Sequence, residues 1–303
     1  MKNFQPAYLA LLETGELNRR ARQAFEMMEK CECCGHRCKS NRAAGKSGVC
    51  RTGVRAMVSS YFPHMGEEAP LTGWRGSGTI FFARCNLRCQ YCQNFDISQA
   101  EEGVETGVEE LSRMMLELQA AGCHNINFVS PTHAAASILE AIALAAEKGL
   151  SIPLVYNTGG YDTVELLQLL DGIVDIYMPD MKYASAQAGL HYSKARNYPT
   201  VNQAAVKEMH RQVGDLKLDD RGIAQRGLII RHLILPNQVA GTREILEFIA
   251  EELSKDTYVN IMDQYRPAYR ASLFPKINRS SKREEIIEAA TIAKELGLVR
   301  GDR

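Results

Sequence analysis

The sequence has no excess charge of either sign, because 36 Lys and Arg residues balance 36 Asp and Glu residues. A protein that binds nucleic acid or an anionic membrane surface usually carries a basic excess, so neither kind of partner is indicated. The sequence also has no apolar run of roughly 18 residues, the length that a membrane span requires. Its first residues lack the apolar stretch of a signal peptide. These absences predict a cytoplasmic protein that binds neither membrane nor nucleic acid.

Internal repeats and low-complexity tracts are also absent, while 45% of the 303 residues are hydrophobic, enough for a large core. The chain does contain nine cysteines. In a reducing compartment, this number indicates metal binding or catalysis rather than disulfide bonds. Their positions support this interpretation, because five lie between residues 31 and 50 and three lie between residues 85 and 92. Only Cys123 stands alone, and we expect a packed thiol there.

The three later cysteines directly follow a short apolar segment. Residues 79–82 (Thr-Ile-Phe-Phe) are β-branched or aromatic and predict a buried strand. Cys85, Cys89 and Cys92 come next, with the spacing C-x3-C-x2-C. Three thiolates from one loop suit a metal or an iron–sulfur cluster. Because a closed site has four ligands, this set leaves one position open for a group that reacts.

The earlier cysteine group follows a helical pattern in residues 5–30, which we expect to break at Thr14-Gly15. Four of its thiols have the spacing C-x2-C-x3-C-x11-C, namely Cys31, Cys34, Cys38 and Cys50. Cys33 would be spare. A segment of about twenty residues has little core of its own, so a metal is the expected source of its order. The spacing does not distinguish zinc from an auxiliary iron–sulfur cluster, and reduced thiols in a flexible arm are the alternative without a metal.

From residue 79 onward, short apolar segments alternate with periodic ones. Strands are expected at residues 79–82, 126–129, 153–156, 174–178, 228–235 and 258–261. Helices are expected at residues 108–121, 134–148, 163–170, 204–213 and 242–253. Six such units predict an α/β fold, either a parallel barrel or a doubly wound open sheet.

Two further segments carry less regular patterns. The polar run at residues 184–200 predicts an irregular segment that could be a lid or a docking insertion. Residues 51–77 predict a connector with a strand candidate at 54–58. His64, Glu67 and Glu68 fall in this connector, where we expect solvated loop positions rather than site residues.

Polar residues stand at the carboxyl ends of the expected strands, where the sites of parallel α/β folds form. After the cysteines of the first strand they are Ser130, Thr132 and His133, then Asn157 and Thr158, then Asp180 and Lys182, then Arg231 and His232, and last Asp263 and Arg266. Buried charges on Asp180 and Lys182 would be costly without partners, so we expect them to pair within a site. Arg231 and His232 are adjacent, so only one of them can point inward from a strand. A helix N-cap would explain Thr132 without a function.

The segment 85–92 (Cys-Asn-Leu-Arg-Cys-Gln-Tyr-Cys) resembles the cluster motif of radical S-adenosylmethionine enzymes. Gln93 and Asn94, which follow it, add a likeness to the pyruvate formate-lyase activating enzyme and other activators of glycyl radical enzymes. Segments 157–159 (Asn-Thr-Gly) and 178–182 (Met-Pro-Asp-Met-Lys) are similar to strand-end segments of these activators. The N-terminal cysteine knuckle resembles one subgroup of the activating enzymes.

The resemblance implies a partial (β/α)6 parallel barrel in residues 75–275, preceded by a helical and cysteine-rich extension in residues 1–74 and followed by a C-terminal helix in residues 276–303. Cys85, Cys89 and Cys92 would bind a [4Fe–4S] cluster, whose fourth iron would take the amino and carboxylate groups of S-adenosylmethionine. One-electron reduction, by a low-potential donor such as flavodoxin or ferredoxin, would give methionine and a 5′-deoxyadenosyl radical.

The same resemblance implies which side chains hold the cofactor: Ser130, Thr132, Asn157, Asp180, Lys182 and His232. Lys182 would bind the methionine carboxylate, and His232 would lie near the ribose or the methionine. Activators of this type carry Gly-Gly-Glu after the second strand, where it contacts the methionine amine. This sequence has Ser130-Pro-Thr-His133 there, so backbone carbonyls, Thr132 or His133 would have to replace it.

Three functions remain open at this point. The first is the installation of a glycyl radical on a partner protein. The second is the same radical chemistry on a small molecule or on another macromolecule. The third is a zinc-only structural or binding protein, which the open three-ligand motif disfavours because structural zinc sites are closed.

Overall fold

A mixed β-sheet forms the centre of the computed structural model, which describes residues 4–100 and 102–301. Within these residues the sheet has nine strands in the order β3-β1-β2-β4-β5-β6-β8-β7, and β9 pairs with β8. Neighbouring strands pair in parallel among β2 (Ser77–Phe82), β4 (Ile126–Val129), β5 (Leu154–Thr158), β6 (Ile176–Pro179), β8 (Ala224–Leu233) and β9 (Tyr258–Met262). These are the six strands that the sequence predicts, and they confirm the α/β fold.

The sheet is curved but is not a closed barrel, since no pairing in the described residues joins β9 back to β2. Antiparallel strands stand at its other margins. β1 (Ala56–His64) pairs with β2, and β3 (Val104–Thr106) pairs with β1. β7 (Lys217–Leu218) pairs with β8. A partial barrel therefore describes the architecture, and β1 is longer than the strand candidate at residues 54–58.

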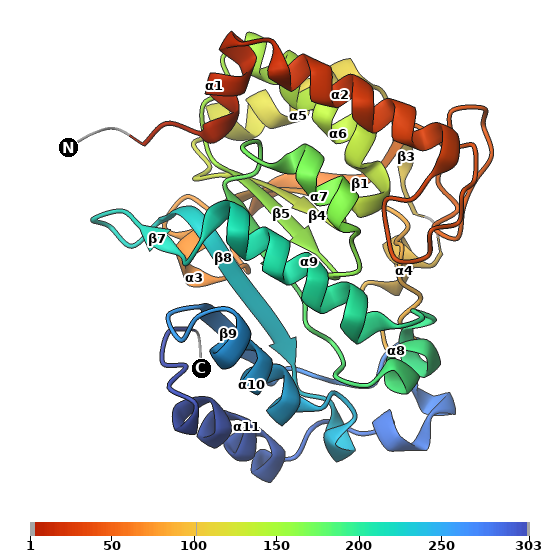
Figure 1. Ribbon diagram of the computed structural model, residues 1–303, viewed down its shortest axis with the longest axis vertical. Helices are drawn as coiled ribbons and strands as arrows, with labels where there is room; N and C mark the ends of the chain where they lie inside the picture. Colours follow the sequence, from red (N-terminus) through yellow and green to blue (C-terminus); the bar gives the residue numbers. More distant parts are fainter. Residues whose placement is uncertain (1–3, 101, 302–303) are drawn as a thin grey trace.

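Helices cover the outer face of the sheet (Figure 1). They are α5 (Val108–Ala120), α6 (Ala135–Glu147), α7 (Val164–Leu170), α9 (Tyr198–Val213), α10 (Thr242–Glu252) and α11 (Arg283–Glu295). The N-terminal helices α1 (Ala7–Glu13) and α2 (Glu16–Glu26) lie along α6 in the same layer. They separate at Gly15, whose φ of 75° is left-handed, at the break that the sequence predicts. In the described residues, no helix combines the length and the apolar character needed to cross a membrane.

Side chains alternate between the two faces of the strands, and this alternation decides which of them reach the barrel interior. In β5, Leu154 and Tyr156 join the large core beneath the helices. Val155, between them, joins an inner core with Ile176 and Ile229 from neighbouring strands. Both cores are apolar, so the register of each strand is fixed by burial on two sides.

The polar run at residues 184–200 is helical, which corrects the expectation of an irregular segment. α8 (Ala186–Ser193) begins at Ser185, whose hydroxyl accepts a hydrogen bond from the Ala188 amide, and α9 begins at Tyr198. Tyr183, Tyr192 and Tyr198 are buried together in one cluster. Burial of these tyrosines orders a segment whose local pattern is weak.

The connector after β1 is also more ordered than the sequence predicts. It contains the short helix α3 (Ala69–Thr72), and Leu71 packs into the inner core of the barrel. Glu67 and Glu68 enter the interior with this helix and are buried, so the prediction of solvated loop positions is wrong for both. The Asn260 amide on β9 donates to the Glu68 carboxylate at 3.0 Å. Long-range packing of Leu71 places these two carboxylates inside the barrel.

Candidate functional site

The cysteine loop joins β2 to the short helix α4 (Phe95–Ser98). Each of its three sulfurs has a polar partner. The Leu87 amide donates to Cys85 Sγ at 3.3 Å, and the Ser193 hydroxyl donates to Cys89 Sγ at 3.0 Å. Cys92 Sγ lies 3.2 Å from the Ser98 hydroxyl. Hydrogen bonds of this kind stabilise sulfurs that carry negative charge, as cluster-bound thiolates do.

The position of the loop is fixed by α8. The Arg88 amide donates to the Ser193 carbonyl at 3.0 Å, and the Gln90 amide donates to the Tyr192 carbonyl at 2.8 Å. A chain of hydroxyls supports Cys89 from the same side. The Tyr183 hydroxyl lies 2.7 Å from the Ser193 hydroxyl that reaches Cys89. The segment that the sequence left as a lid or insertion is therefore the support of the cysteine loop.

Burial raises the pKa of the Cys85 thiol to about 12 and that of Cys89 to about 11, although the nearby Lys182 ammonium opposes both shifts. These thiols stay protonated at neutral pH in the absence of a metal. Iron would supply the positive charge that turns them into thiolates. In the described residues no three His, Cys, Asp or Glu side chains surround a single-ion position. Three sulfurs with polar partners, on one loop, nevertheless fit the ligand chemistry of an iron–sulfur cluster.

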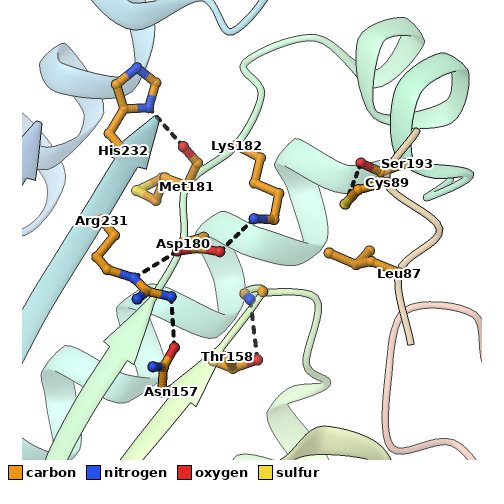
Figure 2. A network of polar contacts seen from close by, with 12 residues as sticks. Leu87, Cys89, Asn157, Thr158, Asp180, Met181, Lys182, Ser193, Arg231 and His232 are labelled. Atoms are coloured by element: carbon orange, nitrogen blue, oxygen red, sulfur yellow. Dashed lines mark hydrogen bonds and ion pairs between the residues drawn. The ribbon is translucent and has the colours of Figure 1, made fainter. Parts of the chain in front are cut away.

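A buried charge network lies beside this loop (Figure 2). The Lys182 ammonium contacts one oxygen of Asp180 at 2.5 Å, and the Arg231 guanidinium donates to the other oxygen at 2.9 Å. Arg231 also donates to the Asn157 side-chain carbonyl at 2.7 Å. Burial raises the pKa of Asp180, but Arg231 and Lys182 outweigh it and hold that pKa below its usual range. Asp180 and Lys182 therefore both have charged partners, as the sequence predicts, and the structure shows that they partner each other.

Gly159 and Gly160 follow β5 where the chain passes between the network and the cysteine loop. A Cβ on Gly159 would lie 2.7 Å from Leu87 of the loop and 3.8 Å from the Lys182 side chain. Gly160, with φ of 71°, turns the chain where a Cβ would lie 2.3 Å from the Asp180 carbonyl oxygen. The two glycines let β5 and β6 approach the loop, which brings Asn157, Asp180 and Lys182 toward the cysteines.

Arg231, not His232, points into this site, because adjacent strand residues face opposite sides. Both ring nitrogens of His232 are engaged on the outer face. Nδ1 lies 2.8 Å from the Met181 carbonyl, and Nε2 lies 2.9 Å from the Thr242 hydroxyl at the start of α10. The expectation of His232 beside the ribose or methionine is therefore not met. The residue that the sequence left unassigned, Arg231, takes the inward position.

Ser130 and Thr132 occupy different environments after β4. Ser130 adopts a left-handed φ of 59° in the turn, and its amide donates to the Asn157 carbonyl at 2.9 Å. The Thr132 hydroxyl is buried and donates to the Asp162 carboxylate at 2.7 Å. Thr132 thus faces the N-terminal cysteines instead of the network of Asp180. Only Ser130 of this pair lies next to a residue of the network.

Two interior groups were not assigned to the site from the sequence. Glu67 Oε2 lies 4.0 Å from Arg231, and burial raises the pKa of Glu67 to about 7 despite that cation. Asn127 on β4 is fully buried, and its side chain interacts with the Glu67 carboxyl and lowers the pKa of that group. Asn127 could have been noticed in the sequence, because it is a polar residue within the otherwise apolar strand at residues 126–129. Glu67 had no local signal, because its burial depends on the packing of α3.

The four N-terminal cysteines with metal-ligand spacing lie close together, as the sequence predicts. Cys31, Cys34, Cys38 and Cys50 line one small cavity together with Cys33. The knuckle packs directly on the cysteine loop. His36 Nε2 donates to the Asn86 carbonyl at 2.8 Å, next to Cys85.

Comparison with known proteins gives one family. The model of the radical SAM superfamily matches residues 79–249. The chain is 33% identical over 306 residues to uncharacterized protein MJ0674 of Methanocaldococcus jannaschii, a match that covers 98% of this chain and 83% of that protein.

Several solved structures are similar to this chain at low sequence identity. The FeFe-hydrogenase maturase HydG of Carboxydothermus hydrogenoformans has a TM-score of 0.50 and 12% identity, over 73% of this chain and 51% of that chain. A second HydG structure has a TM-score of 0.48 and 15% identity, over 74% of this chain and 50% of that one. This chain therefore spans about half the length of the HydG chains. Methylornithine synthase (PylB) has a TM-score of 0.47 and 12% identity, over 97% of this chain and 80% of that one.

The family match over more than half of the chain and the near full-length relative lead to one conclusion: the protein belongs to the radical S-adenosylmethionine superfamily.

Proposed function

We propose that this protein is an activating enzyme that removes a hydrogen atom from a glycine of a partner glycyl radical enzyme. Membership of the superfamily indicates the first half of this reaction, the reductive cleavage of S-adenosylmethionine at an iron–sulfur cluster. When bound, the cluster and S-adenosylmethionine supply a 5′-deoxyadenosyl radical and methionine, with one electron from a low-potential donor such as flavodoxin or ferredoxin. The glycine target is the part that we add.

One observation carries the proposal: the Asp180–Lys182 pair lies beside the cysteine loop that would hold the cluster (Figure 2). The resemblance to activating enzymes rests on these same residues. Burial alone would lower the pKa of Lys182, but Asp180 raises it, so the side chain stays a cation in a mostly buried site. An ammonium is a compact partner for a carboxylate. Lys182 would therefore bind the methionine carboxylate, while Asp180 holds the ammonium in position.

The other residues of the network would orient this pair. Arg231 donates to Asp180 and Asn157 at once, which fixes the carboxylate relative to β5. Ser130 is joined to Asn157 through the backbone and follows β4, where related activators carry Gly-Gly-Glu, so we expect this turn to receive the methionine amine. Tyr91 and Tyr183, whose hydroxyls are 2.7 Å apart, exclude water from the side of Cys89. A dry site protects a reactive radical from side reactions.

A second candidate is a small polar substrate bound inside the barrel. The polar side chains of Asn127 and Glu67 favour it, because they lie together inside the barrel, where a polar ligand could complete their hydrogen bonds. Glu67 lies close to Asn127, and with a pKa of about 7 it could donate or accept a hydrogen bond at neutral pH. These groups would then recognise the molecule from which hydrogen is removed.

The cysteine loop gives the first prediction. Reduced, anaerobically prepared protein should cleave S-adenosylmethionine to methionine and 5′-deoxyadenosine, and Cys89→Ala should reduce this to background because one iron loses its thiolate. Cys123→Ala is the matched control, since Cys123 is a buried thiol outside the loop. Chromatography of 5′-deoxyadenosine measures both. Cleavage that survives in Cys89→Ala would show that the cluster is held elsewhere.

The role of Lys182 gives the second prediction. Lys182→Met should raise the KM for S-adenosylmethionine about 10- to 100-fold, since a charge-assisted hydrogen bond is lost. Lys207→Met is the control, because Lys207 is an exposed lysine paired with Glu252 on the outer surface. The rate of 5′-deoxyadenosine release against cofactor concentration gives both values. An unchanged KM would rule out a contact between Lys182 and the methionine carboxylate.

The glycine target is tested on partner proteins. We expect that incubation of the reduced enzyme and S-adenosylmethionine with the correct glycyl radical enzyme produces a carbon-centred radical signal in electron paramagnetic resonance. The same partner with its radical-site glycine replaced by alanine should give none. If no candidate partner gives a radical signal, while 5′-deoxyadenosine accumulates in the presence of a small polar molecule, then the function on a small polar substrate replaces the activation of a glycyl radical enzyme.

Glu67 gives a prediction for pH. Its folded-state pKa of about 7 lies above the ordinary value of 4.5, so its contribution to stability is complete below about pH 4.5 and is lost as pH rises through 7. Glu67→Gln removes that loss. The free energy of unfolding of the variant should therefore exceed that of the wild type by more at pH 8 than at pH 5, in urea titrations. The exposed Glu109→Gln should show no such difference, and parallel curves for Glu67→Gln would contradict the burial of a charged carboxylate.

A further inference from the structure

The N-terminal cysteine knuckle closes around a buried arginine. The knuckle follows the short helix η1 (Met27–Lys30). Backbone hydrogen bonds join its first residues to those near residue 40: the Cys31 amide donates to the Ser40 carbonyl at 3.1 Å, and the Lys39 amide donates to the Cys31 carbonyl at 2.9 Å. Arg42 comes next and is only 1% exposed. It lines the same small cavity as the cysteines.

Arg42 has no carboxylate partner. Nε donates to the Thr52 and Gly53 carbonyls, both at 3.1 Å, and Nη2 donates to the carbonyls of Gly53 and His133. Nη1 donates to Cys31 Sγ at 3.5 Å. None of the ion pairs within residues 4–100 and 102–301 includes this guanidinium. Backbone carbonyls do not cancel the charge of a buried cation, so most of the partners of Arg42 leave its charge uncompensated.

The groups that could carry the missing negative charge are the thiols. Arg42 lies within electrostatic reach of Cys50, Cys31 and Cys33. Four thiolates on a zinc ion, or on an iron–sulfur cluster, keep a net negative charge and remain stable when buried.

Because four cysteines with ligand spacing line one small cavity around a buried cation, we propose that the knuckle binds a second metal–thiolate centre, with Arg42 as its buried counter-charge. The ligands are Cys31, Cys34, Cys38 and Cys50. The proposal goes beyond the reaction at the first cysteine loop and does not depend on it.

Packing separates the four ligands from the fifth cysteine. Cys33 lines the same cavity, but its Sγ lies 3.5 Å from Met27 Sδ, and it stands outside the ligand spacing C-x2-C-x3-C-x11-C. Cys38 Sγ lies against Gly48, where a Cβ would be 2.6 Å from the sulfur, so the segment that carries Cys50 approaches Cys38 closely. His36 is not a ligand through Nε2, because that nitrogen donates to the Asn86 carbonyl. In the described residues the sulfurs do not surround one point, so we expect their side chains to turn when metal binds.

The second centre would also support the first. Arg88 of the cysteine loop donates to the Val49 carbonyl at 2.7 Å, next to Cys50. The His133 ring donates to the Ala83 carbonyl at 2.9 Å, at the start of the loop, and the His133 carbonyl accepts from Arg42. A knuckle ordered by metal would therefore hold both ends of the loop that carries Cys85 and Cys89.

The test removes the first cluster and counts what is left. A variant with Cys85→Ala, Cys89→Ala and Cys92→Ala, purified anaerobically as the full chain, should retain about one zinc, or about four irons with sulfide, per chain. Metal and acid-labile sulfide analysis distinguishes the two forms, and either supports the proposal. A triple variant without metal overturns it. Because this variant cannot cleave S-adenosylmethionine, the result is independent of the proposed function.

Two further sets of variants test the ligands and the counter-charge in the same background. Cys34→Ser with Cys50→Ser should lose the remaining metal, whereas Cys33→Ser should keep it, and retention in the double variant overturns the ligand set. Arg42→Met should lower metal affinity about 10- to 100-fold in competition with a chelator, and Arg42→Lys, which keeps the charge, should lower it less. Circular dichroism verifies folding. Wild-type affinity in Arg42→Met, or equal loss in both Arg42 variants, overturns the role of the charge.

Discussion

The site depends on one buried carboxylate that holds two cations. Asp180 accepts from Lys182 with one oxygen and from Arg231 with the other. Each of these charges would be unfavourable alone in the barrel interior, and together they compensate one another. Because Arg231 belongs to β8 and also binds Asn157 on β5, the same contacts join three neighbouring strands at their carboxyl ends. Loss of the carboxylate would leave two buried cations and separate the strand ends that face the cysteine loop.

The cysteine loop itself has little internal structure, so its geometry is supplied by its surroundings. On one side, α8 and the buried tyrosines provide backbone carbonyls and the Ser193 hydroxyl. On the other side, the N-terminal knuckle contacts Asn86 and Arg88. Segments more than 100 residues apart in the chain therefore determine how Cys85 and Cys89 are presented. This arrangement explains why the extension and the barrel share one continuous core.

The two cysteine groups share one electrostatic feature, which is a cationic side chain near the sulfurs. At the first group, the Lys182 cation opposes the rise in pKa that burial causes in Cys85 and Cys89. At the second, Arg42 occupies the equivalent electrostatic position and contacts Cys31 Sγ. Both cations are buried, and both would be stabilised by metal-bound thiolates. At both cysteine groups, therefore, a cationic side chain of the protein already lies near the sulfurs before a metal binds.

The sequence by itself determined what is local. The six parallel strands follow from short β-branched runs and the cysteine loop from its spacing. The need of Asp180 and Lys182 for charged partners follows from their place beside a buried strand. Tertiary structure decided everything that depends on distant contacts. Adjacent residues such as Arg231 and His232 carry no local signal for the face that each takes, because the register of β8 is set by its neighbours. Glu67 became buried through the packing of Leu71, and Arg42 through carbonyls of residues up to 91 positions away. Periodicity and spacing describe neighbours in the chain, whereas burial and charge compensation exist only once the chain has folded.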